Sequence, residues 1–256
     1  MSTIYIDGLK EVVSTPTSGV VNGKNKGNPS VELSANDSII LKNVEYAGGG
    51  YNFIEIPAWK NPNNNDLCSL NKVKISDVTH TGALSHNGIS IYSFKEGAEV
   101  VIENVDFQNM GAGNGDGQFL RLSNLKRASN VTITVKNCHM TNTYYGSNGN
   151  YDELWATFGF AQDDFSTDSV VEDYSGFKLN FINCTYNGDP VLLENKNVFT
   201  IWRSKSKSYV KAGEAGAPQI TTSFNLPQET MDALKARYNA LCEATGVTKA
   251  SNPNIQ

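Results

Sequence analysis

The sequence predicts an all-β protein in which short strands stack as a coil, with one α-helix near the C-terminus. Three observations support this fold class. A short pattern recurs five times at a coarse period, and a second alternating strand lies between successive copies. In addition, aromatic residues make up 10% of the chain and charged residues only 18%, which is typical of β-rich, turn-rich proteins.

The recurring pattern is clearest at residues 100–107, Val-Val-Ile-Glu-Asn-Val-Asp-Phe. Each copy reads apolar, variable, Asn or Asp, Val or Cys, polar, and then usually a bulky residue, after an alternating run. This pattern predicts a strand that runs into a bend. The Asn or Asp positions are spaced by 34, 27, 33 and 46 residues, and they are Asn43, Asp77, Asn104, Asn137 and Asn183.

A second short strand is predicted between copies, at residues 53–56, 89–92, 119–122, 157–160 and 198–202. A period near thirty with gaps of variable length suits a coil that winds once per repeat and carries its loops on one side.

On these residues the chain resembles the right-handed parallel β-helices of the pectate-lyase-like superfamily, over roughly residues 31–202. The resemblance implies an all-β, single-stranded right-handed parallel β-helix of about five to six coils, followed by the C-terminal α-helix. It also implies a structural ladder in which stacked side-chain amides bond one another, formed by Asn43, Asp77, Asn104, Asn137 and Asn183. We expect Asn104 and Asn137 to be buried. A carboxylate can only accept hydrogen bonds, so the ladder should be interrupted or protonated at Asp77.

The predicted organisation has three parts. Residues 1–30 form an N-terminal cap or attachment arm, residues 31–202 form the parallel β-helix, and residues 203–256 form a C-terminal strand and an amphipathic helix. The helix should start after the capping sequence at 225–229 and end before Gly246, and it either caps the last coil or packs against a neighbouring subunit. The basic run 203–211 is predicted to be an exposed edge strand. The alternative is that this run docks to an acidic partner.

Two of the four cysteines, Cys138 and Cys184, occupy the position that Val44, Val78 and Val105 fill in the other copies. They should therefore point into the coil as small apolar side chains and remain unpaired. Neither the cysteines nor the three histidines have a metal-ligand spacing, so we expect no metal and no cofactor.

Charge and hydropathy limit the partners. The formal net charge of −5 argues against nucleic-acid binding, which needs a basic surface. No apolar run approaches the ~20 residues that span a bilayer. An acid also stands at Asp7, where a signal peptide would be apolar, so neither a membrane partner nor an export signal is expected.

The candidate binding residues lie in loops and in the basic run. Aromatic rings on loops can bind sugars or proteins, or they can simply cover the neighbouring rung. The aromatic candidates are Trp59, Tyr144, Tyr145 and Tyr151, and the basic ones are Arg203, Lys205 and Lys207.

Catalytic motifs are weak. The residues that resemble polygalacturonase motifs stand in the wrong order, and no Arg-Ile-Lys follows them. A glycoside hydrolase needs two facing carboxyl groups, and Asp116, Glu153 and Asp164 are the weak candidates for that role or for lyase chemistry. Acids in Gly-rich loops are usually solvated, which favours a protein that is not an enzyme.

The resemblance extends to β-helix proteins of bacteriophage virions, including head-decorating proteins, head fibres and tailspikes. It implies a structural, non-enzymatic virion protein on the capsid surface, assembled in the host cytoplasm. Its partners would be other virion proteins, further copies of itself, or host glycans. The alternatives are a tailspike-like protein that binds or cleaves host surface polysaccharide, and a secreted bacterial β-helix surface protein.

Overall fold

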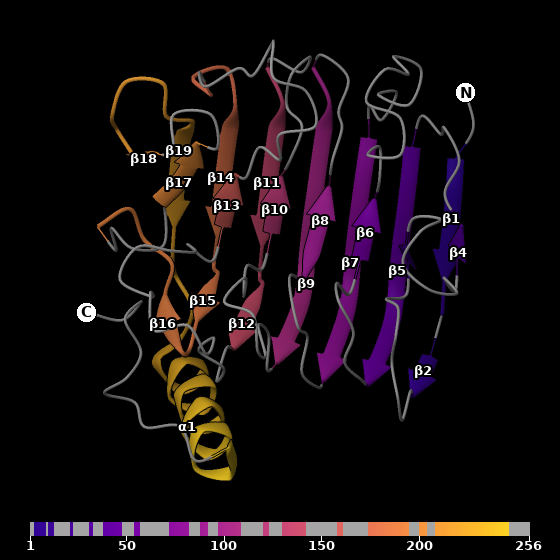
Figure 1. Ribbon diagram of the computed structural model, residues 1–256. Coiled ribbons are helices and arrows are strands. Elements are labelled where there is room, and N and C mark those ends of the chain that lie inside the picture. The colour runs from indigo at the N-terminus through magenta and orange to yellow at the C-terminus, as the bar shows by residue number, and fades with distance from the viewer. Residues whose placement is uncertain are drawn as a thin grey trace.

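A computed structural model shows a chain of mostly parallel β-sheet with one C-terminal α-helix (Figure 1). The structure describes residues 3–8, 10–12, 21–22, 31–32, 38–47, 54–56, 72–81, 88–91, 97–108, 120–122, 130–141, 158–160, 174–194, 200–203 and 208–245. The predicted all-β class with a C-terminal helix is confirmed at this level.

The larger sheet places its main strands side by side in the order β1, β5, β7, β9, β11, β14 and β19 (Figure 1). Every pairing along this order is parallel. The bounds are Thr3–Asp7 (β1), Ser38–Ala47 (β5), Lys72–Thr81 (β7), Glu99–Gln108 (β9), Thr132–Lys136 (β11), Lys178–Ile182 (β14) and Gln219–Ser223 (β19). Shorter strands of the same sheet are β2 (Lys10–Val12), β12 (His139–Thr141), β15 (Thr185–Tyr186) and β16 (Asp189–Pro190).

The second sheet is also parallel and has the order β4, β3, β6, β8, β10 and β13. Its bounds are Val21–Asn22 (β3), Val31–Glu32 (β4), Ile54–Ile56 (β6), Ile89–Ile91 (β8), Leu120–Leu122 (β10) and Phe158–Phe160 (β13). From β5 to β10 the chain alternates between the two sheets, so neighbouring strands in each sheet come from successive sequence repeats. We call one such level of paired residues a rung.

The fifth predicted second strand departs from this scheme. It corresponds to β17 (Thr200–Arg203), which pairs with β18 (Ser208–Lys211) in a separate antiparallel hairpin. β17 still lies next to β13, the last strand of the second sheet, but its recorded backbone pairing is the antiparallel one with β18.

The core lies where the sheets face each other. Within β9, Val100 and Ile102 are buried while Val101 and Glu103 are half-exposed, because successive side chains of a strand point to opposite faces. Matching apolar residues on the adjacent rungs are also buried, and the second sheet contributes buried side chains to the same cluster. Among them are Ile39, Leu41, Val73, Ile75, Ile133, Val135, Leu179, Phe181, Ile89, Ile91 and Leu120.

The sheet extends beyond the range 31–202 predicted for the coil. The first strand, β1, pairs with β5 from Thr3↔Ser38 to Asp7↔Lys42, and the last, β19, pairs with β14. Both predicted terminal segments therefore contribute rungs, while their roles as a cap, an attachment arm or a subunit contact stay predictions.

The predicted helix is confirmed as α1 (Gln228–Thr245). It begins directly after Pro227, whose carbonyl accepts a hydrogen bond from the Met231 N–H at 3.2 Å. It lies at one end of the long strands, near β12, β15 and β16 (Figure 1). The predicted apolar face of the helix contains Met231, Leu234, Tyr238, Leu241 and Cys242, and of these Tyr238 and Cys242 are buried.

Candidate functional site

The recurring Asn and Asp residues adopt a left-handed backbone conformation. Their φ angles are 53° at Asn43, 57° at Asp77, 54° at Asn104, 50° at Asn137 and 55° at Asn183. Asn and Asp tolerate this region better than other non-glycine residues, which explains why the third position of the repeat is restricted to them. On the first rung the equivalent residue is Gly8, with φ 81°. We call these six residues the bend column.

The bend changes which side chains face the core. In β9, Ile102 is buried, Glu103 is half-exposed, Asn104 is exposed, and Val105 is buried again. Regular alternation would have placed Asn104 inside. The left-handed residue therefore acts as one extra residue that points outward, as a bulge does, so that apolar side chains on both sides of it reach the core.

This arrangement corrects the expectation that Asn104 is buried. Asn104 is exposed and Asn137 is half-buried. The reason is the bend itself, which turns the amide side chain to the outside while the residue after it enters the core. The ladder is thus a seam on the outside of the larger sheet.

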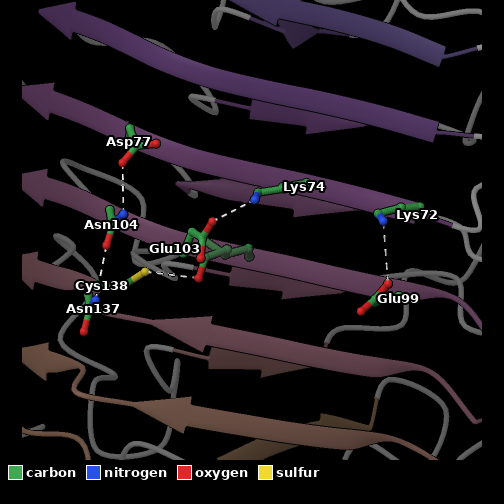
Figure 2. Close-up of polar contacts among 9 residues, drawn as sticks. Lys72, Lys74, Asp77, Glu99, Glu103, Asn104, Asn137 and Cys138 are labelled. Atoms are coloured by element: carbon green, nitrogen blue, oxygen red, sulfur yellow. Dashed lines mark hydrogen bonds and ion pairs between the residues drawn. The ribbon is translucent and has the colours of Figure 1, made fainter.

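The expected side-chain bonding is present over three rungs. Asn104 Nδ2 donates to Asp77 Oδ1 at 2.9 Å, and Asn137 Nδ2 donates to Asn104 Oδ1 at 3.2 Å (Figure 2). On the first rungs Asn43 Nδ2 donates to Asp7 Oδ1 at 2.7 Å. That hydrogen bond, together with nearby Lys42, lowers the pKa of Asp7 below its ordinary value.

The seam is interrupted at Asp77, as its carboxylate predicts. Each bonded amide donates toward the N-terminal rung, so Asn43 Oδ1 would need a donor on residue 77. An ionised Asp has none. Among the described residues, no hydrogen bond joins the side chains of Asn43 and Asp77. None joins the side chains of Asn137 and Asn183 either. The Oδ1 atom of Asn183 instead accepts a hydrogen bond from the Asn225 N–H at 2.9 Å.

Ion pairs lie across the rungs on the same outer face of the larger sheet. Lys74 Nζ is 2.9 Å from Glu103 Oε1, and Lys72 Nζ is 4.0 Å from Glu99 Oε2 (Figure 2). Because the Lys74 and Lys72 side chains are 41% and 51% exposed, each pair contributes at most about 1 kcal/mol. Their arrangement links β7 to β9.

The two cysteines of the repeat point inward and are unpaired, as predicted. Cys138 and Cys184 are 0% and 1% exposed, and they follow Val44, Val78 and Val105 along one buried row of adjacent rungs. Their thiols donate to backbone carbonyls, for example Cys184 Sγ to Val135 O at 3.3 Å. Burial raises the pKa of the Cys138 thiol well above its ordinary value, which makes it unreactive.

Two ion pairs hold α1 against the strand ends. Arg237 makes a two-pronged ion pair with Asp106 of β9, with Nη1–Oδ2 at 2.7 Å and Nη2–Oδ1 at 2.8 Å. Lys235 Nζ contacts Asp189 Oδ1 of β16 at 2.8 Å. We call these two pairs the helix clamp. The Asp106 and Arg237 side chains are only 27% and 31% exposed, so this planar pair is less screened than the outer-face pairs.

A histidine lies beside the helix clamp. His139 of β12 is paired in register with Asp106 of β9 on one side and with Thr185 of β15 on the other. Its Nδ1 is 2.9 Å from Thr185 Oγ1. Burial lowers the pKa of His139 below its ordinary 6.5, Arg237 lowers it further, and Asp106 opposes both.

The row Asp106, His139 and Thr185 contains the residue types of a nucleophilic triad, but its geometry does not fit that chemistry. Thr185 is 1% exposed, and both carboxylate oxygens of Asp106 are engaged by Arg237. A triad would need the carboxylate to orient the histidine and an accessible hydroxyl. The row therefore supports packing of α1.

The candidates drawn from loops lie outside the described residues, and their convergence into a site stays untested. This applies to Asp116, Glu153, Asp164, Trp59, Tyr144, Tyr145, Tyr151, Lys205 and Lys207. Arg203 is described only as the last backbone position of β17, where it pairs with Ser208.

Sequence reasoning missed two features of the α1 end. Asn187 (φ 52°) and Gly188 (φ 80°) form the two-residue loop between β15 and β16, and Asn-Gly is the strongest short-range signal for such a hairpin. The pairing of Asp106 with Arg237, 131 positions away, had no sequence signal.

Within the ranges that the structure describes, no three His, Cys, Asp or Glu side chains gather closely enough to hold a metal ion. In the same part of the chain, no helix combines the length and apolar character needed to cross a membrane.

Comparisons with known proteins found no protein-family model, no curated protein and no solved structure that matches this chain.

Proposed function

We propose that the chain is a right-handed parallel β-helix and a structural, non-enzymatic bacteriophage virion protein that decorates the capsid surface. The observation that carries this proposal is that the described polar side chains bond other parts of the same chain. Those of the bend column bond one rung to the next, and those of the helix clamp fasten α1 to the strand ends.

The alternation of strands between two parallel sheets supports the β-helix. Each return to the larger sheet adds a strand beside the previous one, from β5 through β7, β9, β11 and β14. Parallel connections of this kind are right-handed in about 98% of cases, which favours the right-handed coil.

The buried thiols support synthesis in a reducing compartment. Cys138 and Cys184 occupy adjacent rungs in the core as free cysteines. Unpaired core thiols suit a protein that folds in the cytoplasm, as virion proteins do, better than one that folds during secretion. The same observation weighs against the secreted surface protein.

A decorating role requires a partner on the particle. We propose that this partner is another virion protein or a further copy of this chain, and that neither nucleic acid nor membrane is bound. A net charge of −5 suits a protein partner with a basic surface. Host glycans remain the partner of the alternative, a tailspike.

The test locates the chain on particles. An antibody against the purified protein is applied to virions released by lysis from the culture that produces this chain, and the labelled particles are imaged by cryo-electron microscopy. We expect the antibody to label many positions on the head of each particle. Label on the tail tip would support the tailspike. Protein that is found only in the particle-free fraction would contradict both the capsid-decorating role and the tailspike.

A further inference from the structure

The contact between α1 and the strand ends combines a charged clamp with a titratable neighbour. Arg237 reaches across to Asp106 on β9, and His139 stands on the next rung beside that same carboxylate. The opposite side of the contact is held by Lys235, which bonds Asp189 at 2.8 Å and lies 3.5 Å from the Asn187 carbonyl oxygen.

We propose that α1 is a pH-sensitive latch on the strand ends, which opens when His139 takes up a proton. The latch goes beyond the proposed structural role, because a rigid decoration needs no release of its C-terminal helix.

The electrostatics favour protonation when α1 is undocked. In the docked state His139 is half-buried, and a proton would bring its positive charge close to Arg237 while competing with Arg237 for Asp106. When α1 leaves, the Arg237 guanidinium leaves with it, but Asp106 remains one rung away. An unpaired carboxylate then stabilises the imidazolium.

The sign of the pH effect follows from linkage. The pKa of His139 is lowered in the docked state, so the undocked state binds more protons and docking weakens as pH falls. Docking is strongest above the undocked pKa of His139, and it weakens as pH falls from there toward the lowered docked pKa. Asp106 of β9 and Arg237 of α1 are the charged groups that act on His139 from the elements beside it.

The second pair of the helix clamp should not respond in the same window. The pair of Lys235 and Asp189 contains no histidine, the side chain whose charge ordinarily changes between about pH 5 and 8, so we expect its attraction to be the same at pH 5.5 and 7.5. They hold α1 near the strands while the Arg237 side opens.

Opening exposes groups that are covered in the docked state. Tyr238 and Cys242 are 1% and 2% exposed, and both belong to α1. Loss of α1 docking is therefore visible as faster exchange of α1 amides while β9 stays protected.

The experiment compares amide hydrogen exchange of α1 and β9 in the full chain at pH 7.5, 6.5 and 5.5, with intrinsic exchange rates corrected at each pH. We expect the protection of α1 to fall by up to about tenfold for each unit by which the docked and undocked pKa values of His139 differ. The protection of β9 should change little. Equal protection of α1 at all three values of pH would overturn the proposal.

Two variants separate the latch from general loosening. His139→Gln keeps a partner for Thr185 but cannot titrate, so its α1 protection should not depend on pH. Asp189→Asn is the matched control: it removes the other pair, lowers α1 protection at every pH and retains the pH dependence. A pH effect that persists in full in His139→Gln would contradict the role of His139. An NMR titration of the wild-type protein measures the pKa of His139 independently. A His139 pKa at or above 6.5 in the docked state would contradict the proposed latch.

Discussion

At the scale of single residues, the bend column combines two requirements in one side chain. The left-handed backbone at each bend limits the residue to Asn, Asp or Gly, and the amide then bonds the neighbouring rung. Asn satisfies both requirements, Gly8 satisfies only the first, and Asp77 satisfies the second only as an acceptor. This hierarchy can be measured by substitution.

Asn104 tests the two contributions separately. Asn104→Gly keeps the backbone conformation but removes the hydrogen bonds to Asp77 and Asn137, so we expect a loss of about 1 kcal/mol in the free energy of unfolding. Asn104→Ala and Asn104→Leu add the strain of a left-handed bend, about 1–2 kcal/mol more. Urea denaturation of the three variants checks the order. Equal losses in all three would contradict the conformational explanation.

Asp77→Asn should repair the interrupted seam. Its Oδ1 can still accept from Asn104, and the new Nδ2 can donate to Asn43 Oδ1, which has no such donor now. We expect a gain of about 0.5–1 kcal/mol in the free energy of unfolding. Glu194→Gln, which removes one exposed carboxylate elsewhere, is the control for net charge. If Asp77→Asn raises the free energy of unfolding by no more than Glu194→Gln does, the interruption of the seam at Asp77 has no energetic consequence.

At the scale of elements, the repeats could be predicted from the sequence and the docking of α1 could not. The bend restricts the residue type on the rungs of β5, β7, β9, β11 and β14, and the alternation around it follows the strand period, so these strands can be recognised in the sequence. The ion pair between Asp106 and Arg237 depends on where α1 comes to rest, which no local rule determines. Burial of Asn104 was wrongly expected because the outward bend was not anticipated.

The contact between α1 and the β15–β16 hairpin gives an element-scale prediction. A Cβ on Gly188 would lie 2.8 Å from Lys235 Cα, and the residue also has φ 80°. Gly188→Ala should therefore cost the strain of the left-handed backbone, about 1–2 kcal/mol, and a further 1–3 kcal/mol, roughly, from overpacking against α1.

Gly213→Ala is the matched control, because Gly213 has φ 86° but open space around its Cβ position. Thermal unfolding of both variants isolates the packing of α1. If the two variants lose the same stability, the hairpin and α1 are not closely packed in solution.

At the scale of the whole molecule, the described chain is a scaffold in which buried apolar rows and an external polar seam repeat from rung to rung. Such a stack presents a long, regular surface, and its function depends on what that surface meets. The positions of the loop residues that a glycan-cleaving site would need could not be predicted from the sequence, because Gly-rich and Asn-rich loops carry no periodic signal.

The proposal of a structural protein is tested most directly by an assay of reducing ends released from host surface polysaccharide. We expect none from the wild-type protein, and we expect Asp116→Ala, Glu153→Ala and Asp164→Ala to bind particles as the wild type does. Sustained depolymerisation that is lost on any one of these substitutions would contradict the structural role and establish a glycan-cleaving spike.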